Sequence, residues 1–254
     1  MRWRWATPWW SSAAPTTADM CGRYTLALPL GELVEVFEVE QMALDEWPPR
    51  FNIAPTQSAP VVLADSSGGR RMGLMRWGLV PSWADDPSVG NRMINARSET
   101  AAEKPAFRSA FRARRCLIPA DGFYEWRKPS TGKGPKTPFH IRPKRGGVLA
   151  MAGLWERWRP REDEGEPLLT YTILTRDAAS WLRPLHHRMP VILPPELWSD
   201  WLDPSSESAR LASVLEASDD PQLEAREVST SVNRPANDGP ECVRPVEEGE
   251  TLAR

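Results

Sequence analysis

A cysteine that follows an internal methionine is the first feature of this sequence that could do chemistry. Met20 precedes Cys21, and an initiator methionine is usually removed when the next residue is small, so a start at Met20 would leave Cys21 amino-terminal. Its α-amine, with a pKa of about 7.7–8.0, is partly neutral near pH 7, and its thiolate is a strong nucleophile. This 1,2-aminothiol condenses with aldehydes to a Schiff base and then a thiazolidine. The alternative is a small buried cysteine at the start of a strand.

Asn95 and Arg97, in the segment NARSET, are suited to binding oxygen-rich groups. The Asn95 amide could donate to an oxyanion or hold a substrate hydroxyl. The Arg97 guanidinium could bind a phosphate through a bidentate pair of hydrogen bonds. The same residues are equally typical of a helix start with polar capping.

Glu125 and His186 are candidates for moving protons. In a strand over GFYEW, Phe123 and Glu125 share one face, and a carboxylate among aromatic residues tends to have a raised pKa. An edge-strand glutamate paired with an arginine is the alternative. His186 lies in LHHRMP, and imidazole titrates near neutral pH. Its neighbour His187 would point to the opposite side of a strand, so only one of the two is expected to face a site.

Charge is spread unevenly along the chain. Between Lys104 and Arg145 there are twelve Lys and Arg residues but only Asp121 and Glu125 as acids, which gives this segment a charge of +10 and leaves −12 for the rest. Such asymmetry favours a polyanionic partner on one face, although a solvated charged surface would give the same pattern. Aromatic residues beside that face, as in RWGLVPSWA, suit the stacking of unpaired bases, or else belong to the core.

Length and composition exclude several classes of protein. The 254 residues are 41% hydrophobic and 26% charged, which is ordinary for a globular protein. Three distant cysteines argue against a disulfide framework and for a reducing compartment. The sequence has neither a CxxC pair nor HExxH, so we expect no metal site and no cofactor. No apolar run is long enough to cross a membrane.

The hydrophobic patterns predict an α+β protein with one antiparallel, barrel-like sheet system and short flanking helices. Segment 47–56 is rich in proline and is expected to be irregular, and 81–95 is expected to be a loop. Strands are expected at 22–28, 61–64, 72–80, 116–119, 122–126, 139–141, 148–155, 169–174 and 191–193. Helices are expected at 30–39, 98–103, 106–112, 178–182, 196–202 and 208–217.

Eight segments in order resemble one known family. They are MCGRYT, FNIAPTQ, RWGLVPSWA, NARSET, FRSAFRARRCLIPADGFYEW, MAGLWERW, HHRMPVIL and NDGPEC, and they run from Met20 to about Val243. Together they are similar to the SRAP family (SOS-response-associated peptidases, also called abasic-site processing proteins). The resemblance implies a single α+β domain with a positively charged groove. It also implies an amino-terminal cysteine that forms a thiazolidine with abasic sites in single-stranded DNA.

Carried onto matching positions, the resemblance makes Cys21 the nucleophile. It implies that Asn95 positions the sugar adduct, that Glu125 assists ring opening and Schiff-base formation, and that His186 shuttles protons. For DNA contact we expect Arg97, Arg23, Arg112 and Trp77.

Nineteen residues precede Met20 and depart from the family pattern. We interpret 1–19 as a disordered extension or a mis-called start, 20–245 as the SRAP-like domain and 246–254 as a tail. We expect a monomeric, cytoplasmic, nucleoid-associated protein that does not contact membranes. Two alternatives stay open: an autoproteolytic cysteine peptidase of the amino-terminal-nucleophile type, and a passive module that binds single-stranded DNA.

Overall fold

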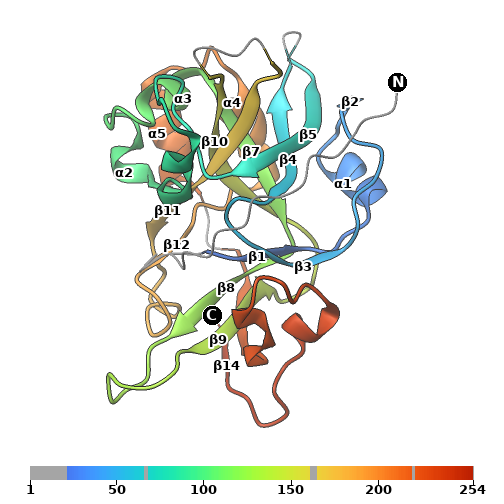
Figure 1. Ribbon diagram of the computed structural model, residues 1–254, viewed down its shortest axis with the longest axis vertical. Coiled ribbons are helices and arrows are strands. Elements are labelled where there is room, and N and C mark those ends of the chain that lie inside the picture. Colours follow the sequence, from blue (N-terminus) through green and yellow to red (C-terminus); the bar gives the residue numbers. More distant parts are fainter. Residues whose placement is uncertain (1–21, 66–67, 161–164, 219–220, 254) are drawn as a thin grey trace.

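Five strands close into a barrel at the centre of the protein, as the computed structural model in Figure 1 shows. The structure describes residues 22–65, 68–160, 165–218 and 221–253. Around the barrel the strand order is β11-β10-β7-β4-β5, and a parallel pairing of β5 with β11 closes it. The strands of this sheet system are β2 (Gln41–Met42), β4 (Ser58–Ala64), β5 (Arg70–Trp77), β6 (Asn95–Arg97), β7 (Arg115–Ala120), β10 (Leu149–Trp158), β11 (Leu168–Asp177) and β12 (Arg188–Pro190).

A second sheet lies below the barrel in Figure 1, with the strand order β14-β13-β9-β8-β1-β3. All of its pairings are antiparallel. Its strands are β1 (Tyr24–Leu26), β3 (Arg50–Ile53), β8 (Gly122–Arg127), β9 (Thr137–Pro143), β13 (Leu223–Glu227) and β14 (Thr251–Ala253). The chain passes from β7 of the barrel into β8 of this sheet with one residue between them, which ties the two sheets together.

Short helices cover the outside of the barrel, as the sequence predicts. They bury only a few apolar residues each, because none exceeds nine residues. The α-helices are α1 (Leu30–Val36), α2 (Ser98–Ala101), α3 (Arg108–Ala113), α4 (Trp198–Leu202) and α5 (Ser208–Glu216). The 3-10 turns are η1 (Pro87–Arg92), η2 (Pro195–Leu197), η3 (Thr230–Asn233) and η4 (Pro240–Val243). The predicted single-domain α+β fold is therefore confirmed.

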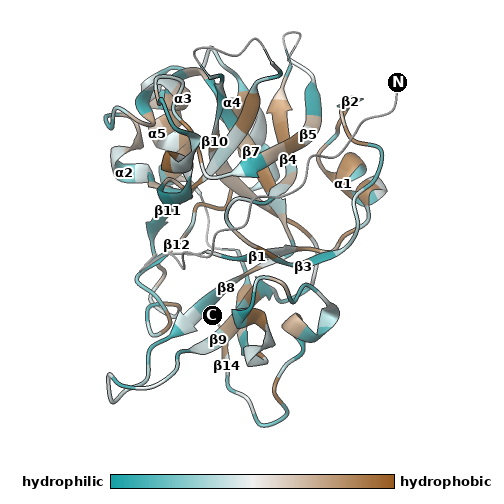
Figure 2. Cartoon of the chain, in the orientation of Figure 1, coloured by the Kyte–Doolittle hydropathy of each residue, from teal (hydrophilic) through white to brown (hydrophobic). Residues whose placement is uncertain are grey.

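Aromatic rings join the barrel to the second sheet. Trp77 is fully buried, stacks parallel to Tyr171 at a centroid distance of 6.3 Å, and meets the edge of Tyr24 at 5.2 Å. The hydroxyls of Tyr24 and Tyr171 lie 2.7 Å apart and form a buried hydrogen bond. Figure 2 shows the apolar residues concentrated on the central strands. Strand β1 is thus held to the barrel by one stacked and hydrogen-bonded group of rings.

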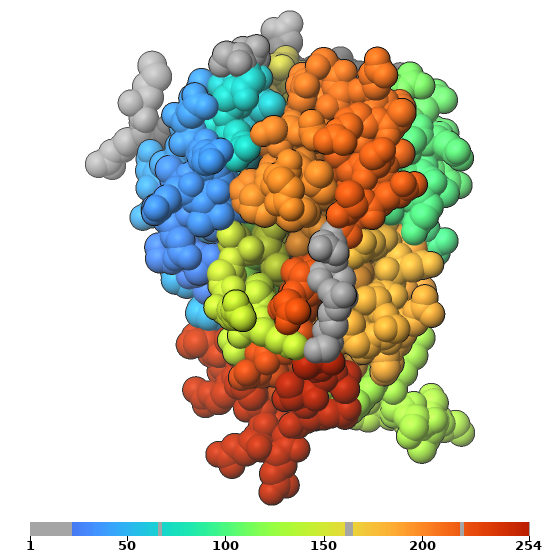
Figure 3. All heavy atoms as spheres, turned by 180° about the vertical axis from the view of Figure 1, so that it is seen from behind, coloured from blue at the N-terminus to red at the C-terminus, as the bar shows by residue number. Residues whose placement is uncertain are grey.

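The C-terminal segment is fastened to β3 through two side chains. The Asp238 carboxylate accepts from the backbone N–H groups of Phe51 and Asn52, each at 2.7 Å. The buried Asn52 amide donates to the carbonyls of Val232, Arg234 and Asn237 at 2.7–3.1 Å. From behind, Figure 3 shows the C-terminal residues spread over the lower part of the molecule. These bonds bring FNIAP and NDGPEC, which are far apart in sequence, together in the fold.

Several local predictions were wrong. No helix forms over residues 178–182; a turn covers 180–185 instead, because Pro184 has no N–H and disfavours helical backbone at Arg183. Segment 47–56 contains β3, since its three prolines flank Arg50–Ile53 rather than interrupt it. The strand expected at 191–193 lies earlier, as β12, and Ile192 makes only an isolated bridge to Met151.

Parallel pairings also depart from the antiparallel expectation. They occur where β11 meets β5 and β6, and where β2 meets β5. The strand β5 ends where Gly78, at φ 117°, turns the chain and donates its N–H to the Tyr171 carbonyl at 2.8 Å. Among the described residues, no helix is long and apolar enough to cross a membrane.

Two tryptophans from the same sequence segment provide a matched test of this core. Trp77→Ala should lower the free energy of unfolding by about 3–5 kcal/mol, because it removes a fully buried ring. Trp83→Ala should change it by less than about 0.5 kcal/mol, because that ring is 58% exposed. Denaturant unfolding followed by circular dichroism measures both. Equal effects of the two substitutions would contradict the assignment of Trp77 to the core.

Candidate active site

Glu125 and His186 meet in a buried position. Glu125, on β8, is 3% exposed, and its Oε1 lies 3.7 Å from Nδ1 of His186. Phe123 and Glu125 share the inward face of β8, as the strand alternation predicts. A separation of 3.7 Å is too long for a good hydrogen bond, but it allows an ion pair once the imidazole is protonated. The sequence motifs GFYEW and HHRMP therefore contribute to one site.

The Nδ1 atom of His186 has a backbone partner in either protonation state. The N–H of Arg188 lies 3.1 Å from Nδ1 and can donate to it when Nδ1 is unprotonated. The Arg188 carbonyl lies 3.2 Å from the same nitrogen and can accept from it when Nδ1 carries a proton. The ring of His187 packs against that of His186 with centroids 4.4 Å apart. This geometry suits a group that must gain and lose a proton without moving.

Strand β11 brings the NARSET segment beside HHRMP. Its residue Thr175 pairs with Arg97 of β6 and also with Pro190 of β12. The two short strands therefore flank the same end of β11. Asn95, at the start of β6, is 7% exposed, whereas Arg97 is exposed.

Arg188 fastens these two segments together. Its guanidinium donates to Oε1 and Oε2 of Glu99 at 2.7 and 2.8 Å, to Asp177 at 2.6 Å and to the Thr175 carbonyl at 2.5 Å. Burial alone would lower the pKa of Arg188, but the bonds to Glu99 and Asp177 raise it above its usual value. The same bond lowers the pKa of Glu99. We did not single out Arg188 or Glu99 from sequence, although both lie within the quoted motifs.

The beginning of the described chain lies along the strand that carries Glu125. Strand β1 runs antiparallel to β8, with Tyr24 opposite Phe123, and the N–H of Tyr124 donates to the Arg23 carbonyl at 3.0 Å. Continued toward the amino terminus, this register leads toward Glu125. Cys21 itself lies outside the described residues, which begin at Gly22.

Arg23 has partners within the protein. Its Nη1 donates to Oδ1 of Asn52 at 2.8 Å and to the Val232 carbonyl at 2.9 Å. Burial lowers the pKa of Arg23 below its usual value. The residue as a whole is only partly buried. The sequence analysis did not predict a role for Asn52, although its position in the FNIAP motif could have indicated one.

The expected DNA contacts divide into exposed and buried residues. Arg97 and Arg112 are exposed, Arg112 near the end of α3. Trp77 is 0% exposed and donates through Nε1 to the Ile94 carbonyl at 2.8 Å. The expectation that Trp77 contacts DNA is therefore wrong for this conformation, because no face of its ring is open to a base. In the same motif, Trp83 is the exposed ring.

The basic segment from Lys104 to Arg145 does not form one uniform surface. Arg115 is buried and donates to the carbonyls of Phe111, Arg112, Trp201 and Asp203, and burial lowers its pKa to about 10. Arg114 pairs with Glu156 at 2.7 Å and Arg127 with Glu250 at 2.5 Å. Several of these cations thus stabilise the fold rather than remaining available to a partner. In the part of the chain that is described, no group of three or more His, Cys, Asp or Glu residues is placed to hold a metal ion.

Known proteins similar to this chain carry related names. It is 42% identical over 228 residues to the abasic site processing protein YoqW of Bacillus subtilis, covering 88% of this chain and 99% of that protein. It is 35% identical over 271 residues to the abasic site processing protein HMCES of Gallus gallus, covering 91% of this chain and 79% of that protein.

Solved structures show the same fold. A protein from Bacteroides thetaiotaomicron superposes with a TM-score of 0.75 at 25% identity, covering 89% of this chain and all of that one. A protein from Bordetella bronchiseptica gives 0.67 at 28% identity, with 82% and 100% covered. The family model described as SOS response associated peptidase (SRAP) matches residues 20–235. The chain therefore belongs to the SRAP family.

Proposed function

We propose that this protein processes abasic sites by covalent capture, with Cys21 as the nucleophile and single-stranded DNA as the substrate. The observation that carries the proposal is the buried Glu125–His186 pair, which lies where the register of β1 along β8 leads from Gly22. Relatives named as abasic site processing proteins cover nearly the whole chain and support the substrate class. No cofactor is needed for the chemistry.

The reaction joins two nucleophilic atoms of one residue to one carbon. The neutral α-amine of Cys21 adds to the C1′ aldehyde of the ring-opened sugar, and loss of one water gives a Schiff base. The thiolate then adds to the same carbon, and the amine nitrogen takes up a proton to complete the thiazolidine. The net change is formation of C–N and C–S bonds and release of one water.

Three side chains have defined tasks at the reacting sugar, and three arginines bind phosphates. Glu125 delivers the proton that lets hydroxide leave as water and assists opening of the sugar ring. His186 exchanges protons with Glu125 once their 3.7 Å separation shortens, or is bridged by a water, in the DNA complex. Asn95, buried at the start of β6, holds a sugar hydroxyl.

The arginines bind the DNA backbone. Arg97 and Arg112 bind phosphates from the exposed surface, and Arg23 binds a phosphate through the N–H groups that do not bond Asn52.

This chemistry requires a free amine on Cys21, so we propose that Cys21 is the first residue of the working protein. The family match beginning at residue 20 supports this. A self-processing peptidase remains the second candidate, because the family description names a peptidase. The two differ in the bond attacked: capture needs an aldehyde, whereas a peptidase needs an amide.

Intact mass spectrometry tests the central step. A form beginning at Met20 and a form beginning at Met1 are each mixed with single-stranded DNA that bears one abasic site. We expect a protein–DNA adduct, lighter than the sum of the two masses by one water, only where the measured protein mass shows Cys21 to be terminal. Cys21→Ala should abolish the adduct and retain weak, salt-sensitive binding. An adduct that survives Cys21→Ala would exclude the mechanism.

Glu125→Gln tests the proton-transfer role. The amide fills nearly the same volume but cannot exchange a proton, so we expect adduct formation to slow by about 100-fold or more while DNA affinity changes by less than about 3-fold. Single-turnover rates from gel-resolved adducts, beside fluorescence-anisotropy affinities, separate the two effects. If the rate were unchanged, Glu125 would be a structural carboxylate.

Arg97→Ala tests the phosphate contact. Losing one phosphate contact should reduce the slope of log affinity against log salt concentration by about 0.7 for single-stranded DNA. Arg210, an exposed arginine of α5 that pairs with Asp200, offers a matched control in Arg210→Ala. Anisotropy titrations between low and moderate salt measure the slope. If wild type and Arg97→Ala gave the same salt dependence of affinity, Arg97 would not contact a phosphate.

A further inference from the structure

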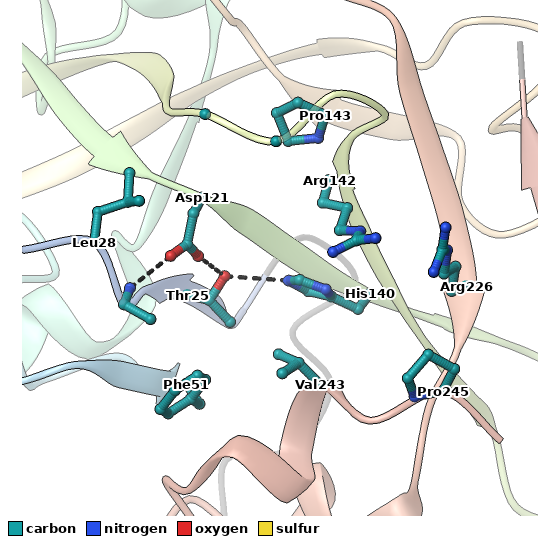
Figure 4. A pocket seen from close by; sticks show the side chains of 13 residues that line it. Thr25, Leu28, Phe51, Asp121, His140, Arg142, Pro143, Arg226, Val243 and Pro245 are labelled. Atoms are coloured by element: carbon teal, nitrogen blue, oxygen red, sulfur yellow. Dashed lines mark hydrogen bonds between the residues drawn. The ribbon is translucent and has the colours of Figure 1, made fainter. Parts of the chain in front are cut away.

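A pocket of about 350 Å³ opens on the second sheet, in a region that the proposed capture reaction does not use (Figure 4). Its residues come from β1 and the loop after it, β3, the residue before β8, β9 and the loop after it, β13 and residues 243–245. They form a polar floor, a cationic wall and an apolar wall. The polar floor consists of Thr25, Asp121 and His140. The cationic wall consists of Arg142 and Arg226. The apolar wall consists of Leu28, Phe51, Val243 and Pro245.

Strand alternation separates this pocket from the candidate active site. Thr25 lies opposite Gly122, and His140 lies opposite Tyr124, with the Tyr124 and His140 rings 5.0 Å apart. Gly122 and Tyr124 occupy the face of β8 opposite to that of Phe123 and Glu125. The pocket and the Glu125–His186 pair are therefore on opposite faces of the same strand.

The floor is a hydrogen-bonded chain of three side chains. The Thr25 hydroxyl donates to Asp121, and Nε2 of His140 lies 3.1 Å from the same hydroxyl oxygen. Since the one hydroxyl proton goes to Asp121, His140 donates from Nε2 to Thr25. Burial, and then the nearby Arg142, lower the pKa of His140 to about 3, so the ring is neutral at physiological pH. Burial raises the pKa of Asp121.

Glycine at position 122 is needed for this arrangement. A Cβ on Gly122 would lie 2.2 Å from Nε2 of His140 and 2.8 Å from the Ile141 carbonyl, so any larger residue would displace the imidazole. The Thr25 hydroxyl and the Nε2–H of His140 are used within the floor, so the group that the floor offers to a sugar hydroxyl is the partly exposed carboxylate of Asp121, held in place by Thr25.

The wall beside the floor carries two guanidinium groups on neighbouring strands. Arg142 on β9 and Arg226 on β13 both bond Oε1 of Glu224, at 3.1 and 2.8 Å. Two cations share this one carboxylate, and their side chains remain 41% and 38% exposed. Each guanidinium has five N–H donors, so both retain donors for an anion. Paired arginines of this kind match the geometry of a phosphate group.

The remaining walls could hold the apolar part of a ligand that carries both a phosphate and a sugar. Phe51 and Val243 offer apolar surface opposite the arginines in Figure 4. Gly146 and Gly147, with φ 73° and 94°, form a rim without side chains. A volume of about 350 Å³ is within the size range of small-molecule sites.

We propose that this pocket binds a nucleoside monophosphate, with the phosphate on Arg142 and Arg226, the sugar on the Thr25–Asp121–His140 floor and the base against Phe51. The ligand is a free nucleotide or the 5′-phosphorylated end of a DNA strand, which share this chemistry. The proposal does not depend on capture by Cys21, because the pocket uses none of the residues assigned to it.

Calorimetric titration of the full chain tests the proposal with thymidine 5′-monophosphate, thymidine and inorganic phosphate, none of which carries a reactive aldehyde. We expect one saturable site whose affinity for the monophosphate exceeds that for either fragment by about 10-fold or more. Short oligonucleotides with and without a 5′-phosphate, mixed with the Cys21→Ala protein, show whether a strand end is accepted as well. Absence of binding by every phosphorylated probe, or equal binding of monophosphate and phosphate, would overturn the proposal.

Variants locate the site. Arg142→Gln and Arg226→Gln should each weaken binding of the monophosphate by about 10-fold or more, since each removes charge-assisted hydrogen bonds. Val243→Trp keeps every charge but fills the pocket, and should also weaken binding. Arg210→Gln is the control, because Arg210 is an exposed arginine in an ion pair outside the pocket. Circular dichroism confirms that each variant is folded. Wild-type affinity in all three pocket variants would contradict the assignment.

The same variants separate this proposal from covalent capture. Arg226→Gln should form the abasic-site adduct at the wild-type rate, whereas Cys21→Ala should bind the monophosphate with wild-type affinity. Loss of monophosphate binding in Cys21→Ala would show that the ligand occupies the capture site and not this pocket.

Discussion

The buried guanidinium of Arg188 is the interaction on which the arrangement of the candidate site depends. A buried charge is costly unless it is paired and fully hydrogen-bonded. Arg188 is 4% exposed, and Glu99, Asp177 and the Thr175 carbonyl pair its charge and accept from both terminal nitrogens, although its buried Nε has no partner among the described residues. Its partners come from α2 and β11, so satisfying the charge fixes β12 and the NARSET segment at one end of the barrel. His186, two residues before Arg188, is thereby held against Glu125.

Much of the fold could be predicted from sequence because its strands carry strong local patterns. Segments such as LLTYTI and LAMAGLWERW are rich in aliphatic and aromatic residues, and they form the first part of β11 and the whole of β10. Strands of three residues, such as β6, have too few positions to show alternation, and their existence depends on pairing with a distant strand. Barrel closure through parallel β5 and β11 likewise leaves no local signal. The proline-rich segment around β3 misled the prediction, because flanking prolines and interrupting prolines look alike in composition.

Sequence motifs predicted some residues of the candidate site, whereas tertiary packing determines which of the other residues are exposed. The motifs gave Glu125 and His186, and the structure brings them to 3.7 Å. Motifs could not say which tryptophan of RWGLVPSWA is exposed, because that depends on the ring of Tyr171, almost a hundred residues later, which packs on Trp77. They also overstated the basic segment. Arg115 donates to four backbone carbonyls, two in α3 and two at the end of α4, so its role depends on how these helices pack and not on its charge alone.

One strand, β8, connects the two proposed sites. Its residues alternate between a face that carries Glu125 and a face on which Gly122 leaves room for His140. A change that shifted the register of β8 by one residue would exchange these faces, remove Glu125 from His186 and place a side chain against the imidazole of His140. The Tyr24–Tyr171 hydrogen bond ties β1, the neighbour of β8, to the barrel, and the Arg23–Asn52 contact ties the start of β1 to β3. With its neighbour β1 fixed in this way, β8 can carry the proposed capture site on one face and adjoin the proposed anion site on the other, without a residue that serves both.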